Sequence, residues 1–126
     1  MVRRLVAGRR VGALEYAVLV VLWDGGGWLS GREVWERLGD ESRAYTTVMT
    51  ILGRLVDKGL VERGEGGRGH VYRAAGDADE LTARAISSLL AATADPRSAL
   101  AHFVEGLDDP GLVAELADVV DRVRRR

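Results

Sequence analysis

The sequence predicts a mostly α-helical fold with one small β-hairpin, and three observations support this. A helix-shaped run over residues 44–58 has one apolar face and one threonine-rich face. A glycine-rich hairpin over residues 60–73 follows this helix at once. After residue 75, three further helical segments each begin with an aspartate. This order is that of a winged helix-turn-helix followed by a helical dimerisation region.

The composition is that of a globular protein in a reducing compartment. The 126 residues are 47% hydrophobic and 29% charged, which suits one domain or one domain with an appendage. Cysteine is absent, so disulfides and thiolate metal sites are excluded. The apolar run over residues 17–23 is shorter than the roughly 20 residues needed to cross a bilayer, and a turn rather than an export cleavage site follows it. We therefore expect a cytoplasmic protein without an export signal.

The charge is unevenly divided along the chain. Residues 1–75 hold twelve Lys and Arg against nine Asp and Glu, a balance of +3, whereas residues 76–126 hold six against ten, a balance of −4. A basic front part indicates a polyanionic partner, and an acidic rear part indicates another role. We expect a DNA-binding domain over residues 1–75 and a three-helix dimerisation region over residues 76–126.

Two short helices are predicted ahead of the threonine-rich one. The first runs over residues 14–23, where apolar side chains recur at helical spacing. The segment 28–29 fits a short strand. Ser30 and Glu33 then form a capping box at the start of a second helix, which ends near Leu38.

The third helix carries the candidate contact surface. On a helical wheel its buried face consists of Ala44, Val48, Ile51, Leu52 and Leu55. An α-helix fits the major groove of DNA, where hydroxyl and guanidinium groups can bond base edges or phosphates. The alternative is an ordinary solvated polar face. The candidate DNA-binding residues on this helix are Tyr45, Thr46, Thr47, Thr50 and Arg54.

The hairpin supplies a second candidate contact. Residues 64–69 are rich in glycine, so the backbone can turn tightly and Arg68 projects at the tip. A cation at this position suits a phosphate or the minor groove, a contact that positions a protein on DNA without reading its sequence. Arg63 and Arg73 on the strands are weaker candidates.

The rear part is predicted to pair with a second copy of the chain. Asp77, Asp95 and Asp109 begin its three helices, and proline follows the last two of these aspartates. The apolar stripes of these helices belong to a segment too short to close a good core alone. Packing onto the front domain is the alternative to a dimer. The expected dimer interface consists of Leu100, Phe103, Val104, Leu112, Leu116, Val119, Val120 and Val123.

Catalytic and cofactor chemistry have no support in the sequence, so we expect no enzyme, no cofactor and no metal. His70 and His102 are far apart in the chain, and neither has a cysteine or a spaced carboxylate set beside it. The glycine run of the hairpin leads into a strand, whereas a phosphate-binding loop leads into a helix. The tryptophans expected in the hydrophobic core are Trp23, Trp28 and Trp35.

The helix, hairpin and rear segments together resemble the penicillinase-repressor (BlaI/MecI) family of winged-helix transcriptional regulators. The segments that carry the resemblance are 14–23, 44–55, 58–61, 71–73 and 98–104. The resemblance implies a homodimeric, sequence-specific repressor of transcription that binds a palindromic operator, with resistance or stress-response genes as its targets.

The resemblance also implies how repression ends. In this family a membrane sensor protease triggers cleavage within the rear helices, at an Asn-Phe bond in the well-known members. His102 and Phe103 occupy the matching position, with histidine in place of asparagine. The implied partners are therefore double-stranded DNA, a second copy of the chain and a membrane sensor protease, without insertion of this chain into the membrane.

Two other functions fit the sequence. A winged helix can serve as a protein-interaction module without specific DNA binding, with its threonine face against a partner protein. A regulator of the same fold can also bind a small ligand between its DNA-binding heads and its rear helices.

Overall fold

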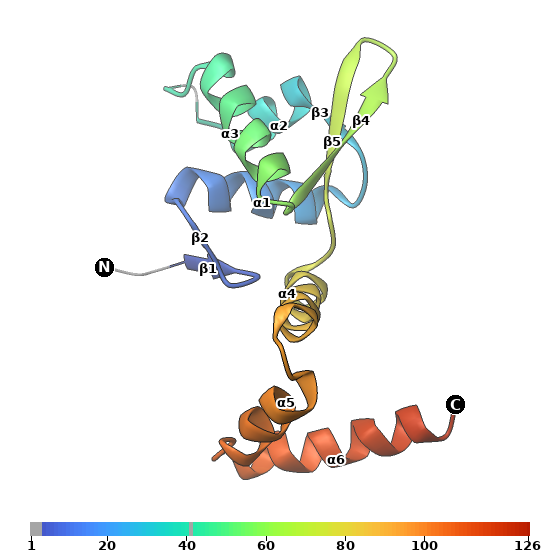
Figure 1. The fold of residues 1–126 in the computed structure, drawn as a ribbon. Helices are drawn as coiled ribbons and strands as arrows, with labels where there is room; N and C mark the ends of the chain where they lie inside the picture. The colour runs from blue at the N-terminus through green and yellow to red at the C-terminus, as the bar shows by residue number, and fades with distance from the viewer. Residues whose placement is uncertain (1–3, 41) are drawn as a thin grey trace. The chain divides into compact units, whose positions relative to one another are not determined.

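The chain forms two units that divide between Ala85 and Ile86, the front unit and the rear unit. The structure is a computed structural model that describes residues 4–40 and 42–126. The front unit contains β1 (Arg4–Val6), β2 (Arg9–Val11), α1 (Ala13–Gly25), β3 (Leu29–Ser30), α2 (Gly31–Leu38), α3 (Tyr45–Asp57), β4 (Val61–Gly66) and β5 (Gly69–Ala74). The other elements are α4 (Ala78–Ala92), which crosses the division, α5 (Pro96–Glu105) and α6 (Pro110–Arg124) (Figure 1).

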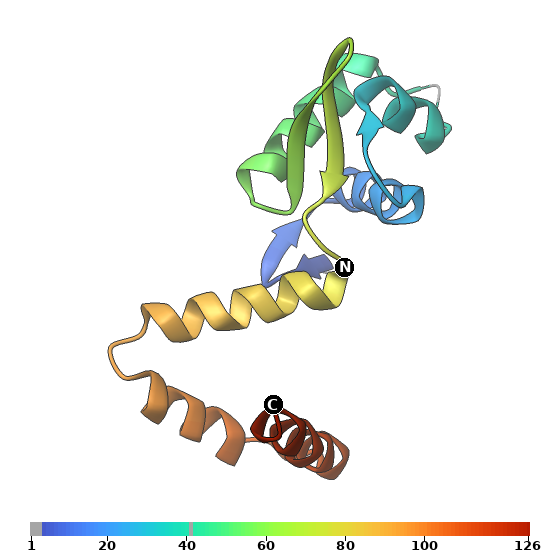
Figure 2. The same cartoon turned by 90° about the vertical axis from the view of Figure 1, so that its right-hand side faces the viewer.

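The front unit is a winged helix-turn-helix, as the sequence predicts. The helices α1, α2 and α3 all contact one another. A three-stranded antiparallel sheet has the order β3-β5-β4 (Figure 2). We call β4, β5 and the turn between them the wing. Its register pairs Val61 with Ala74 at the base and Gly66 with Gly69 at the tip.

One hydrophobic core holds the front unit together. It joins α1, α2 and α3 to the base of the wing, to the N-terminal strands and to the beginning of α4. The largest share comes from α3, so the position of this helix depends most directly on the core. The buried side chains are Val6, Val11, Val18, Leu19, Leu22, Leu29, Val34, Val48, Ile51, Leu52, Leu55, Leu60, Val61, Tyr72 and Leu81.

Side-chain caps fix the starts of several helices. The Glu33 N–H donates a hydrogen bond of 3.1 Å to the Ser30 hydroxyl, and the Ser30 N–H donates one of 3.1 Å to the Glu33 carboxylate. Hydrogen bonding to Ser30, first of all to its N–H, lowers the pKa of Glu33. The predicted capping box is therefore confirmed. Asp95 and Asp109 likewise accept hydrogen bonds from the first turns of α5 and α6.

The strands β1 and β2 form an N-terminal hairpin that the sequence pattern does not predict. Its turn lies at Ala7 and Gly8, whose φ values are 53° and 74°. Val6 and Val11 lie in the core, while Arg9 is exposed. With three residues in each strand, the alternation of apolar and polar side chains is too short to recognise.

The rear helices bury little of their apolar surface within one chain. No residue of α5 or α6 is buried. An exposed apolar surface of this extent is typical of an interaction site. The large apolar side chains exposed from residue 86 onward are Ile86, Leu89, Leu100, Phe103, Leu112, Val113, Val119, Val120 and Val123. The domain boundary expected after residue 75 stays a prediction.

An ion pair ties α1 to the end of α3. The Lys58 ammonium donates a hydrogen bond of 2.7 Å to the Glu15 carboxylate and another of 3.1 Å to the Arg10 carbonyl. The Glu15 side chain is 13% exposed, and the Gly12 N–H also donates to it. Burial alone raises the pKa of Glu15, but the hydrogen bonds from Lys58 and Gly12 and the nearby positive charges outweigh burial and bring the pKa below 4.5.

We expect Glu15→Gln to destabilise the front unit by about 1–2 kcal/mol at pH 7, because it removes the charged partner of a half-buried lysine. The folded pKa of Glu15 lies below the unfolded one, so the parent's advantage is complete above the unfolded value and is lost as the pH falls through the folded value. The difference between parent and variant in the free energy of urea unfolding should therefore shrink between about pH 5 and pH 3.

Glu36→Gln is the control for this experiment. It removes an exposed ion pair with Arg32, whose atoms are 3.2 Å apart, and should leave the stability nearly unchanged. A difference between parent and Glu15→Gln that stays constant down to pH 3 would contradict the assignment.

Candidate nucleic-acid interface

The helix α3 presents the predicted contact residues on its exposed side. Val48, Ile51, Leu52 and Leu55 are buried, as the helical wheel predicts. Ala44 is exposed, because it precedes the first turn as the N-cap and does not join the buried face. The residues of this helix predicted to contact DNA are all exposed: Tyr45, Thr46, Thr47, Thr50 and Arg54.

The Thr50 hydroxyl is already engaged as a donor. It donates a hydrogen bond of 3.0 Å to the Thr46 carbonyl, one turn earlier. Its oxygen can still accept a hydrogen bond, and its methyl group can make an apolar contact. Thr50 is therefore suited to a base edge that offers a donor or a methyl group. In the major groove adenine and cytosine offer a donor and thymine offers a methyl group.

The two ends of the exposed face have different surroundings. Tyr45 packs edge-on against Trp35 of α2, with the ring centroids 6.2 Å apart. Trp35 in turn donates a hydrogen bond of 2.9 Å to the Arg43 carbonyl, which ties the backbone just ahead of α3 to α2. At the other end, burial raises the pKa of Glu15 and neighbouring hydrogen bonds lower it, and Arg54 is close enough to add to the lowering.

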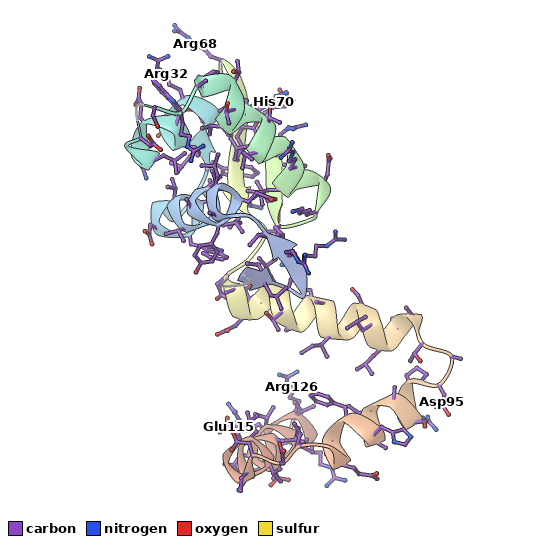
Figure 3. All side chains as sticks on the ribbon, turned by 90° about the vertical axis from the view of Figure 1, so that its left-hand side faces the viewer. Arg32, Arg68, His70, Asp95, Glu115 and Arg126 are labelled. Atoms are coloured by element: carbon purple, nitrogen blue, oxygen red, sulfur yellow. The ribbon has the colours of Figure 1, made fainter. Side chains whose placement is uncertain are left out.

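The wing ends in a two-residue turn formed by Gly67 and Arg68. The pair Gly66 and Gly69 closes this turn, so the strands extend further into the glycine run than the sequence suggests. Within that run the positive φ is at Gly69, where it is 120°. Arg68 is exposed at the tip, where the sequence predicts it (Figure 3).

Trp28 lies against the wing and outside the core, so its predicted core position is wrong; the other two tryptophans do pack against the core. Trp28 is 43% exposed. A Cβ on Gly64 would come within 2.9 Å of the indole, so glycine is what lets the ring approach β4. The Arg73 guanidinium stacks 4.3 Å from the ring centroid and pairs with Glu62 at 3.0 Å. Arg73 therefore stiffens the wing, which makes it a weaker candidate for a DNA contact.

Arg63 lies on the side of the wing that is nearest to α3. Its guanidinium lies 5.7 Å from the ring centroid of Tyr72, its partner residue across the strands. Its Nη2 atom is 3.8 Å from the position that a Cβ on Gly53 would occupy. Arg63 forms no ion pair with any residue among 4–40 and 42–126. It therefore joins the candidate contacts between α3 and the wing.

Two more polar residues belong to this surface without a signal in the sequence pattern. Arg32 lies in the first turn of α2 and His70 lies on β5, and both line one pocket together with Tyr45 and Arg68. These residues come from separate elements, so no spacing along the chain relates them. The register of the wing and the packing of α2 on α3 are needed to find them.

Other chemistry has no visible site in the described parts of the chain. There, no group of three or more His, Cys, Asp or Glu side chains could hold a metal ion. His70 and His102 lie on different elements, β5 and α5. In the same residues, no helix combines the length and the apolar character that a membrane span requires.

Comparison with known proteins relates most of the chain to one family. The sequence model of the penicillinase repressor family matches residues 11–122. The transcriptional regulator BlaI of Mycobacterium tuberculosis, in two strains, is 39% identical over 120 residues, which cover 92% of this chain and 81% of the relative. Among solved structures, oxidised MarR from E. coli has 18% identity and a TM-score of 0.47, over 90% of this chain and 75% of that one. A MarR family regulator from Streptomyces coelicolor has 23% identity and a TM-score of 0.47, over 90% of this chain and 73% of that one.

We expect Trp28→Ala to loosen the wing without unfolding the front unit, because it removes the ring that packs on Gly64 and Arg73. The amides of β4 and β5 should exchange with solvent about tenfold faster, as expected for a loss of about 1–1.5 kcal/mol of local packing. The control Glu62→Gln keeps the stacked ring and removes only the exposed ion pair with Arg73, so it should change the exchange little. Unchanged exchange in Trp28→Ala would mean that the indole does not order the wing.

Proposed function

Because the chain belongs to the penicillinase repressor family, we propose that it represses transcription as a homodimer bound to a palindromic DNA operator. The observation that carries the proposal is the exposed threonine face of α3, which is next to the wing and opposite a face buried in the core. The related regulator from M. tuberculosis supports the regulatory role over 92% of this chain. The names of these relatives describe regulators and not enzymes.

In this proposal α3 enters the major groove and the wing lies beside it. The Thr50 hydroxyl already donates its hydrogen bond to the Thr46 carbonyl. Its oxygen therefore accepts a hydrogen bond from a base, or its methyl group packs on a thymine methyl. Arg54 binds guanine or phosphate through two parallel hydrogen bonds from its guanidinium. Arg68 at the wing tip contacts a phosphate or the minor groove and positions the protein. The proposed contacts are Tyr45, Thr46, Thr47, Thr50, Arg54 and Arg68.

The rear helices supply the dimer interface in this proposal. In the single chain Phe103 is 59% exposed, Leu112 is 55% exposed and Val123 is 50% exposed. Such a surface is stable in water when a second copy covers it, and a two-fold axis lets one patch serve both copies. The linked heads then bind two half-sites together. The proposed interface residues are Leu100, Phe103, Val104, Leu112, Leu116, Val119, Val120 and Val123.

Release is proposed to follow cleavage of the rear helices under the control of a membrane sensor protease. His102 and Phe103, both exposed on α5, form the candidate bond. A cut there separates α6 from the DNA-binding head, which removes much of the proposed interface and with it the gain from two linked heads. The proposed place of action is the cytoplasm, and the proposed targets are resistance or stress-response genes.

Selection from a random pool of duplexes should yield a palindrome, and the logarithm of the affinity for it should fall with the logarithm of the salt concentration by about 0.9 per neutralised phosphate. If Arg54 contacts guanine rather than phosphate, Arg54→Ala should weaken binding to the palindrome by about 1–3 kcal/mol and change binding to scrambled DNA less. Arg37→Ala is the matched control. It removes the same kind of side chain from α2, where the guanidinium lies near Gly25 at the end of α1 and outside the proposed DNA contacts.

The outcomes separate the repressor from its rivals. Binding that does not depend on salt, or a pool that yields no palindrome, would reject the repressor in favour of a protein-interaction module. An Arg54→Ala variant that binds both duplexes as the parent does would reject this arginine as a reader of bases and leave the repressor in place.

Val119→Asp should give monomers in sedimentation, because it places a charge in the apolar stripe of α6, where the valine is 36% exposed in the single chain. The affinity for the operator should fall by at least about tenfold, since two unlinked heads bind independently. Ala114→Asp puts the same charge on the other side of α6 and should remain dimeric. Circular dichroism checks that both variants keep their helices. A Val119→Asp dimer as stable as the parent's would reject this placement of the interface.

A further inference from the structure

A pocket of about 630 Å³ opens where α2, α3 and the wing meet. Arg32 lines it from the first turn of α2, Tyr45 from the start of α3, and Arg68 and His70 from the wing. Figure 3 shows Arg32, Arg68 and His70 at the same end of the front unit. Two guanidinium groups and a phenol from three separate elements therefore border one hollow.

The acidic groups near the pocket leave its cations available. None of the described residues that line the pocket is acidic. Glu36 pairs with Arg32 at 3.2 Å, but the two side chains are 56% and 72% exposed, so the pair is weak and exchanges readily. Glu65 lies 3.5 Å from His70, and its side chain is 84% exposed. Arg68 has no ion pair in the described parts of the chain.

Packing beneath the pocket holds its walls in place. The Tyr45 ring lies edge-on against Trp35, with 6.2 Å between the centroids. Gly31 is buried next to Met49, and the Tyr45 hydroxyl is 3.5 Å from the position that a Cβ on Gly31 would occupy. The close approach of α2 to α3 thus brings the phenol to the start of α2, near Arg32. The phenol of the pocket is therefore ordered before a ligand arrives.

We propose that this pocket clasps one backbone phosphate of DNA, with the Arg32 and Arg68 guanidinium groups on its oxygens and the Tyr45 hydroxyl as a third donor. This site rests on the DNA binding proposed above. Guanidinium groups bind paired phosphate oxygens through two parallel hydrogen bonds, and the pocket has room for the attached sugar. Tyr45 is next to Thr46, so a strand that borders the groove occupied by α3 passes this pocket. Arg32 exchanges Glu36 for the phosphate when the duplex binds.

The clasp fixes how α3 sits in the groove and does not select the bases. One phosphate joins α2 to the wing, so both elements keep the same register on the backbone. Contacts to phosphate carry no direct sequence information. Loss of the clasp should therefore weaken binding to the selected palindrome and to scrambled DNA by the same factor.

A double-mutant cycle on the full chain tests the clasp, with the duplex selected from the random pool as the ligand. Arg32→Ala and Arg68→Ala should each weaken binding about tenfold to both selected and scrambled duplexes. The double variant should lose less than the product of the two single losses, because both arginines hold the same group. Its salt slope should fall by about 1.8 relative to the parent, which is about 0.9 for the one clasped phosphate in each of the two half-sites. Arg37→Ala, on the same helix and outside the pocket, should match the parent.

Each other outcome overturns the clasp in a distinguishable way. Independent losses with a slope that falls by about 3.6 would mean two separate phosphates in each half-site. Losses no larger than that of Arg37→Ala would mean that the pocket takes no part in DNA binding. If the parent itself does not bind duplex DNA, the proposed function fails and the clasp fails with it. Titration with inorganic phosphate gives the last comparison: variants that lose phosphate binding but keep their duplex affinity would mean a free-anion site.

Discussion

The burial of one face of α3 is the constraint on which the rest of the structure depends. Val48, Leu52 and Leu55 are fully buried, so the helix cannot turn about its axis without exposing them to water. Each such side chain contributes about 1.5–3 kcal/mol through burial, which makes the orientation of the helix stable. The threonines on the opposite side are exposed for this reason. The core therefore decides which side of α3 is exposed and available for binding.

The same constraint reaches the wing. Leu60 and Val61 continue from the end of α3 directly into the core, which attaches the base of β4 to the helix. Trp28 then packs on the wing at Gly64, which pairs with Val71 and lies between this base and the tip. The ribbon is thus held at two levels, at its base and at Gly64. The surface formed by α3 and the wing can therefore bind a rigid partner without first ordering the ribbon.

The helices and the wing were predictable because their signals are local. The capping box at Ser30 and the aspartate before each of α5 and α6 act within a single turn, and the helices begin at these positions. Other features depend on segments that are distant in the chain. The N-terminal hairpin is ordered by Val6 in a core built mainly from later residues. The position of Trp28 requires Arg73, and the pocket requires three elements at once, so neither leaves a periodic pattern.

The net charge of −1 says little about binding to a polyanion, because local pairing decides which cations remain available. The front-unit cations that a carboxylate holds are Arg32, Arg43, Lys58 and Arg73. On α3 and the wing, Arg54, Arg63 and Arg68 form no ion pair with any residue that the structure describes. A polyanion that meets these three displaces no internal partner, so its attraction is not offset by broken pairs. This division between paired and unpaired cations shows where charge is available on α3 and the wing, which the balance of +3 over residues 1–75 does not.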